Sequence, residues 1–107
     1  KMYKKINKIT EEFTLKLFRR GSDTKNFNIL KNLPTTIIKI SKKLDITKMP
    51  ANKRVNELEE VGLVKRKKKE WIIEQTGLTN PFIKTIESIQ KGVNKELSSL
   101  IELSLKG

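Results

Sequence analysis

The sequence predicts a mainly α-helical domain with one small β-hairpin and with long N- and C-terminal helices. Apolar residues recur at steps of three and four along most of the chain, which is the helical period. The period changes to two only near residues 63–74, where a short hairpin is expected. At 107 residues the chain is too short to bury two separate cores, so we expect a single domain over residues 1–107.

The first helix is predicted over residues 2–18. Its apolar stripe steps by four, three, four and four, through Met2, Ile6, Ile9, Phe13 and Leu17. A basic pair, Arg19 and Arg20, then precedes Gly21, which suits the end of a helix. Residues 22–24 offer N-caps for a short second helix that carries Phe27 and Leu30 and is stopped by Pro34.

Two further helices follow, separated by a tight turn at residues 45–47. Thr35 or Thr36 caps the first of them, whose inner face carries Ile37, Ile40 and Leu44. The second runs from about residue 48 to 61 and tolerates Pro50 in its first turn. Its inner stripe is Ala51, Val55 and Leu58. Gly62 ends it.

The hairpin is predicted from strands at residues 63–66 and 70–74, on either side of Lys67–Lys69. Trp71 would begin the second strand and anchor the hairpin in the core on the same face as Ile73; stacking on a base or sugar is the alternative. The last helix is expected at about residues 80–105, after the Asn80–Pro81 start signal.

Charge is the main compositional signal. Twenty-four Lys and Arg against 12 Asp and Glu give a net charge of +12. Such an excess favours a polyanionic partner, namely DNA, RNA or an anionic membrane surface, although a merely solvated surface is the alternative. The absence of Cys and His excludes disulfides, thiolate or imidazole metal sites and His-based acid–base chemistry. We expect no cofactor, no metal and no catalytic residue, and therefore no enzyme. No apolar run is long enough for a membrane span, so a cytoplasmic location is expected.

Residues 40–47 (ISKKLDIT) followed by residues 55–66 (VNELEEVGLVKR) resemble the winged helix-turn-helix family, in particular its MarR- and ArsR-type DNA-binding domains. The resemblance covers about residues 27–79. Asp45 stands where the family usually has Gly, and Asp tolerates the left-handed conformation; Ser41 stands for the usual Ala. The resemblance implies a helix-turn-helix at about 35–61, a wing at about 63–74 and double-stranded DNA as the partner.

Candidate base-reading residues lie on the outward face of the helix at 48–61, near its N-terminus: Lys48, Met49, Asn52, Lys53 and Asn56. Asn can pair with adenine and Lys can reach guanine, so Asn52, Lys53 and Asn56 are the preferred readers. The alternative for each is a solvated helix face.

The wing offers five consecutive cations for phosphates or the minor groove: Lys65, Arg66, Lys67, Lys68 and Lys69. Thr35 and Thr36 are further candidates for phosphate contacts, although capping is sufficient to explain them.

The C-terminal helix has little net charge and an apolar seam of Ile86, Ile89, Val93, Leu97 and Leu100. So small a core cannot bury all of this seam, so we expect a homodimer to which the first helix also contributes; packing within one chain is the alternative.

The expected function is a sequence-specific DNA-binding dimer without an effector domain. By analogy of size and architecture it is similar to the TubR-like centromere-binding adaptors of plasmid and phage partition. That similarity implies a filament-forming, tubulin-like GTPase as a partner and repression of the adaptor's own operon. The alternatives are an ordinary transcriptional repressor and a sequence-neutral chromatin protein.

Overall fold

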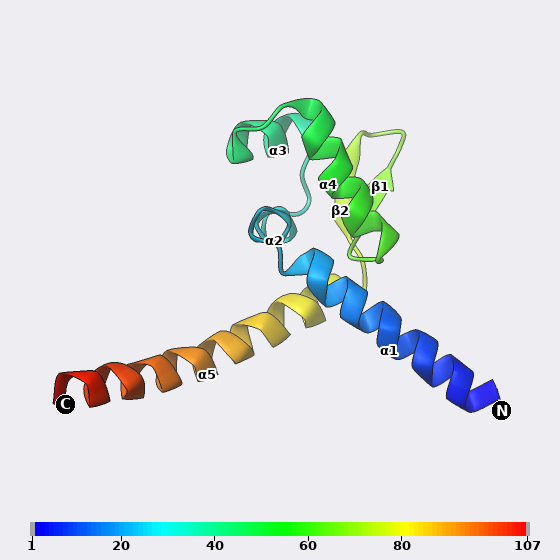
Figure 1. Ribbon diagram of the computed structural model, residues 1–107. Helices are drawn as coiled ribbons and strands as arrows, with labels where there is room; N and C mark the ends of the chain where they lie inside the picture. Colours follow the sequence, from blue (N-terminus) through cyan, green and yellow to red (C-terminus); the bar gives the residue numbers. More distant parts are fainter. Residues whose placement is uncertain (1, 107) are drawn as a thin grey trace.

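A computed structural model describes the backbone of residues 2–106 and the side chains of residues 5–105. The chain is mainly helical and carries one two-stranded antiparallel hairpin, as the sequence predicted (Figure 1). In chain order the elements are α1 (Met2–Gly21), α2 (Thr24–Lys31), α3 (Ile37–Leu44), α4 (Lys48–Glu60), β1 (Val64–Lys67), β2 (Ile72–Gln75) and α5 (Thr79–Lys106).

Helices α2, α3 and α4 and the hairpin form a small body around one apolar core. The predicted inner stripe of α4 is confirmed, because Ala51, Val55 and Leu58 are all fully buried. Leu30 of α2 and Ile73 of β2 are buried in the same cluster. The opposite side of α4 is consequently turned outward.

The end of α1 and the start of α5 pack closely beneath this body. The ring of Phe82 meets that of Phe18 edge to face, with centroids 5.2 Å apart. A Cβ added at Gly21 would lie only 2.6 Å from the Phe82 ring and 2.9 Å from Leu63. Gly21 is therefore required here for close approach, in addition to ending the helix.

The turn between α3 and α4 depends on Asp45, which adopts the left-handed conformation with φ 54°. The expectation that Asp tolerates this conformation in place of Gly is confirmed. The backbone N–H of Ile46 then donates to Ser41 O at 3.0 Å. Thr36 caps the start of α3 by accepting from the N–H of Lys39 at 3.2 Å.

The hairpin differs from its prediction in the bounds of its strands and in the role of Trp71. Its strands begin one and two residues later than expected, with Val64 paired to Gln75, and residues 68–71 form the turn. The prediction that Trp71 anchors the hairpin is wrong, because its side chain is 84% exposed in that turn. Ile73 is the anchor. Its backbone also pairs with Thr35, through hydrogen bonds of 2.8 and 3.0 Å.

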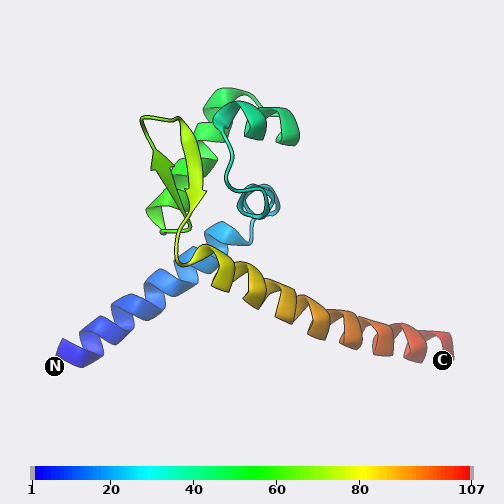
Figure 2. The same ribbon diagram turned by 180° about the vertical axis from the view of Figure 1, so that it is seen from behind.

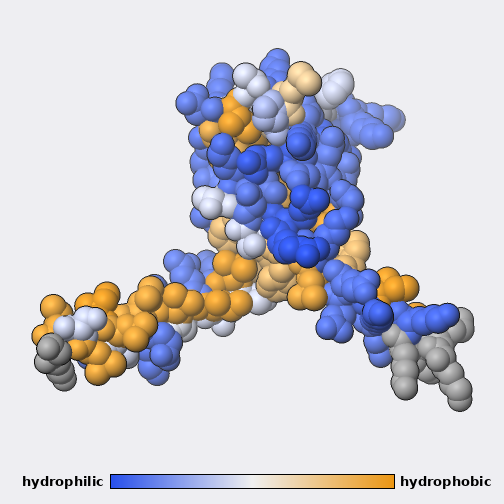
Figure 3. All heavy atoms as spheres, viewed as in Figure 1, coloured by the Kyte–Doolittle hydropathy of each residue, from blue (hydrophilic) through white to orange (hydrophobic). Residues whose placement is uncertain are grey.

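Two helical arms leave the body in different directions, one formed by the N-terminal part of α1 and the other by α5 (Figures 1 and 2). We call residues 87–106 of α5 the C-terminal arm. The radius of gyration is 17.4 Å, whereas a compact domain of this length has about 13 Å. Figure 3 shows hydrophobic residues along the length of α5 and a mostly hydrophilic body. The arms are thus the part of the fold that one chain leaves unpacked.

Candidate nucleic-acid interface

The outer face of α4, defined as Lys48, Met49, Lys53 and Asn56, is exposed to solvent. It is exposed because α4 buries the opposite stripe completely. Met49 stands near the N-terminus with 83% of its surface exposed. Asn52, the remaining predicted reader, is only half-exposed and lies on the flank of α4 that faces the hairpin.

Arg66 of β1 binds that flank of α4 and forms what we call the Arg66 cluster. Its guanidinium donates to the side-chain oxygen of Asn56 at 2.7 Å and to that of Asn52 at 3.2 Å, and it lies 3.7 Å from Glu59. The amide nitrogen of Asn52 donates in turn to the backbone oxygen of Lys48 at 3.1 Å. Both polar ends of Asn52 are therefore engaged within the protein, and Arg66 is a structural contact between β1 and α4.

The other hairpin cations divide into paired and unpaired residues. Lys67 lies 3.1 Å from Glu74 and 3.9 Å from Glu70, and Lys65 lies 4.0 Å from Glu74. The hydrogen bond and the charge of Glu74 raise the pKa of the Lys67 ammonium above its ordinary value.

Lys68 and Lys69, in the turn, lie within 4.0 Å of no carboxylate in the part of the chain that the structure describes, and the same holds for Lys48 and Lys53 on α4. Among the cations of α4 and the hairpin, these four lysines are the ones that remain available to an external anion. Of the five hairpin cations predicted to contact DNA, Lys65, Arg66 and Lys67 are therefore already paired with acidic side chains of the protein.

The two threonines proposed as phosphate contacts have separate positions. Thr35 is only 6% exposed and its backbone pairs with Ile73, so little of it is accessible to a phosphate, and the phosphate contact stays a prediction. Thr36 is half-exposed and caps α3, and it also borders an open groove between the hairpin and the N-terminal ends of α3 and α4.

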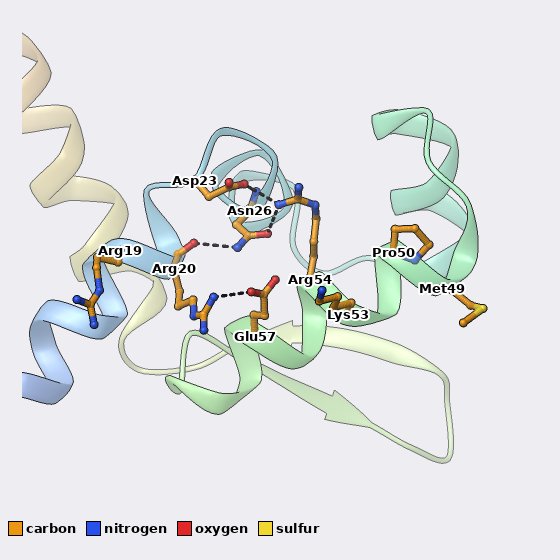
Figure 4. Close-up of a pocket in the computed structure, with 9 residues that line it drawn as sticks. All are labelled: Arg19, Arg20, Asp23, Asn26, Met49, Pro50, Lys53, Arg54 and Glu57. Carbon is orange, nitrogen blue, oxygen red and sulfur yellow. Dashed lines mark hydrogen bonds and ion pairs between the residues drawn. The ribbon is translucent and has the colours of Figure 1, made fainter.

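A second polar surface lies on the other flank of α4, where an open cleft of about 700 Å³ separates α4 from α1 and α2 (Figure 4). Arg20 pairs with Glu57 at 2.6 Å, and Arg54 pairs with Asp23 at 2.7 Å and with Asn26 at 3.1 Å. Arg19 of α1 and Lys53 of α4 also line the cleft. Cations therefore outnumber acids on this flank too.

Asp23 connects the cleft to the start of α2. Its carboxylate accepts from the backbone N–H groups of Lys25 and Asn26, both at 3.1 Å, and so caps the helix. Partial burial raises the pKa of this carboxyl, but the hydrogen bond from Asn26 and the charge of Arg54 outweigh that effect and hold the pKa below its ordinary value.

Sequence reasoning missed Arg19, Arg20 and Arg54 as neighbours of this face. The only signal is that Arg54 follows Lys53 on the same helix, while the sequence pattern places the two arginines of α1 in a basic last turn. Their approach to α4 depends on how α1 packs beneath the body, which is a long-range property.

One residue of the predicted seam of α5 is partly buried, and the others are exposed. Ile86 packs partly against the core of its own chain, whereas Ile89, Val93, Leu97 and Leu100 are exposed along the C-terminal arm. Ile6, Ile9 and Phe13 of α1 are exposed as well.

Nowhere in the described residues do three or more His, Cys, Asp or Glu side chains gather as metal ligands would. None of the helices in residues 2–106 combines the length and apolar character that crossing a bilayer requires. The chain matched neither the models of known protein families nor any curated protein with which it was compared.

Proposed function

We propose that the chain is a winged helix-turn-helix protein that binds double-stranded DNA as a homodimer. In this proposal α3 and α4 are the helix-turn-helix, α4 is the recognition helix, and the β1–β2 hairpin is the wing. The observation that carries the proposal is the position of the free cations. Lys48 of α4 and Lys68 of the hairpin border one groove, and Lys53 continues the surface along α4.

The shape of this surface suits a duplex. An α-helix with an exposed N-terminal half fits the major groove, and a basic hairpin beside it reaches the phosphates or the minor groove. Lys53 is the strongest candidate for base reading, because it is exposed on the outer face of α4 and no acid among the described residues pairs with it. Asn56 keeps its amide nitrogen for a base, whereas Asn52 would first have to leave the Arg66 cluster.

Exposed apolar residues on the two arms support the proposed dimer. The seam of the C-terminal arm repeats at steps of three and four, the spacing with which two helices pack along each other. An apolar groove of about 480 Å³ lies where α1 meets α5, lined by residues that include Ile9, Phe13 and Phe82. In the proposed dimer the C-terminal arm of a second copy occupies this groove. In that arm Glu87, Glu96 and Glu102 balance Lys91, Lys95 and Lys106, so it brings no net charge to the cationic α1, whereas a second α1 would add charge of the same sign.

The direct test measures binding of a fluorescently labelled duplex of random sequence by anisotropy as a function of salt. Four free lysines in each of two protomers would neutralise about eight phosphates, which gives a log–log salt slope of about −7. Affinity would fall by roughly a thousandfold or more between about 50 and 200 mM salt. Binding of similar strength across that range would refute the electrostatic basis of the proposal.

Selection from a pool of random duplexes distinguishes a sequence-specific protein from a sequence-neutral one. A sequence-specific regulator or partition adaptor enriches a defined motif, whereas a sequence-neutral chromatin protein enriches none. The partition role stays a prediction. It requires cooperative binding to tandem copies of the selected motif and co-sedimentation of that complex with a polymerising tubulin-like GTPase. An ordinary repressor would need only a single operator.

A further inference from the structure

Trp71 is the only tryptophan in the chain, and the protein does not use it for packing. It lies at the end of the hairpin turn, 84% exposed, with φ 56°. The left-handed conformation costs a bulky residue about 1–2 kcal/mol, and an exposed indole gains nothing from burial. Ile73, two residues later, already anchors the hairpin. The fold therefore holds a mostly exposed aromatic ring on a backbone conformation that carries a free-energy cost.

The ring borders an open groove of about 540 Å³ between the hairpin and the N-terminal ends of α3 and α4. One part of its lining is apolar and includes Ile38, which is itself exposed, and Ile72. Lys48 and Lys68, both without a carboxylate partner, line the same groove. An occupant must therefore combine an apolar or aromatic surface with negative charge on its flanks.

Duplex DNA has this combination, since the faces of its bases and sugars are flanked by phosphates. We propose that the indole of Trp71 stacks on a base at a partly opened step of the DNA, with Lys48 and Lys68 on the adjacent phosphates. This inference rests on the proposed DNA binding and adds a source of sequence preference to it. Pyrimidine–purine steps unstack most easily, so the protein would favour a TA or CA step beneath the hairpin.

The single tryptophan makes the test direct. In the free protein its fluorescence should be readily quenched by acrylamide. Addition of a TA-containing duplex should quench the emission by base stacking and protect the ring from acrylamide, with saturation at the same stoichiometry as the anisotropy signal. Affinity should fall roughly 5- to 100-fold for Trp71→Ala, less for Trp71→Leu, and little for Trp71→Phe. Because the ring is exposed, circular dichroism should show that all three variants fold.

The outcomes separate this inference from the proposed function. Saturable DNA binding with unchanged Trp71 emission, together with wild-type affinity for Trp71→Ala, would overturn the stacking and leave DNA binding intact. Equal affinity for duplexes with and without a TA or CA step would overturn the step preference. An emission change with anionic phospholipid vesicles but not with duplex would identify a membrane surface instead. Failure of every duplex to bind would refute the proposed function itself.

Discussion

Arg66 of β1 donates a hydrogen bond to the side-chain oxygen of Asn56 in α4, over 2.7 Å. The same guanidinium contacts Asn52 at 3.2 Å, so one side chain of the hairpin holds two polar residues of the neighbouring helix. The orientation of the hairpin relative to α4 is thereby coupled to the conformation of two candidate base-reading residues. Arg66, which the sequence predicts to contact phosphate, thus also has a structural role.

Replacing Arg66 with Met should lower the free energy of unfolding by about 1–3 kcal/mol, because hydrogen bonds from a charged, mostly buried donor are lost. Urea denaturation measures this change. Lys65→Met, at the exposed neighbouring position, should change it by less than about 0.5 kcal/mol. Equal effects of the two variants would show that the Arg66 cluster contributes nothing specific. The selected DNA motif should also broaden for Arg66→Met, since Asn52 and Asn56 are released.

Lys53 and the turn lysines should affect DNA binding differently. Lys53→Ala should reduce discrimination between the selected motif and random duplex by about 1–3 kcal/mol if its contact reads guanine. The double change Lys68→Ala and Lys69→Ala should weaken both duplexes alike and reduce the salt slope by about one per lysine. Lys91→Ala on α5 is the control and should alter neither. Anisotropy titrations at several salt concentrations distinguish these patterns, and their reversal would assign base reading to the hairpin.

The C-terminal arm should hold the dimer together. Changing both Val93 and Leu97 to Asp should yield a monomer, because each apolar side chain withdrawn from water contributes about 1.5–3 kcal/mol. Analytical ultracentrifugation then reports 12.4 kDa instead of twice that mass. Lys95→Asp, on the opposite side of the helix by its spacing, should remain dimeric. A wild-type monomer at micromolar concentration that still binds its motif tightly would contradict the proposed assembly.

Two glycines should respond in opposite directions to alanine. Gly21→Ala should destabilise the chain by about 1–3 kcal/mol, because its methyl group would overlap the Phe82 ring. Gly92→Ala should stabilise it by up to about 1 kcal/mol, since nothing lies within 4 Å of the added atom and Ala is the better helix former. Thermal denaturation of both variants is sufficient, and stabilisation by Gly21→Ala would mean that α1 and α5 do not meet as described.

Asp23 should make stability sensitive to acid. Its pKa is lowered on folding, so its charge stabilises the fold above the unfolded value of 3.8 and this contribution is lost as the pH falls through the folded value. Asp23→Asn keeps a capping side chain but has no such charge. Wild type should therefore exceed the variant in stability at about pH 7, and the difference should shrink below about pH 4. A difference that stays constant over this range would exclude the pairing with Arg54.

Much of the fold follows from local patterns in the sequence. The inner stripe of α4 was predictable because a helix places every third or fourth residue on one side, whatever lies opposite. Asp45 in the left-handed turn was predictable from its own conformational preference. The exposed seam of α5 was predictable because its apolar residues exceed what a core of this size can cover.

Other features were decided only when distant segments met. The position of Trp71 depended on where the second strand begins, because β2 starts at Ile72 and leaves Trp71 in the turn. The involvement of Asn52 with Arg66, the burial of Thr35 against Ile73 and the approach of Arg20 to Glu57 all join residues far apart in the chain. Periodicity determines which face of an element a residue occupies. Hydrogen-bond and ion-pair partners are instead set by how the packed elements approach one another. For this reason only the tertiary structure could separate the free cations from the paired ones.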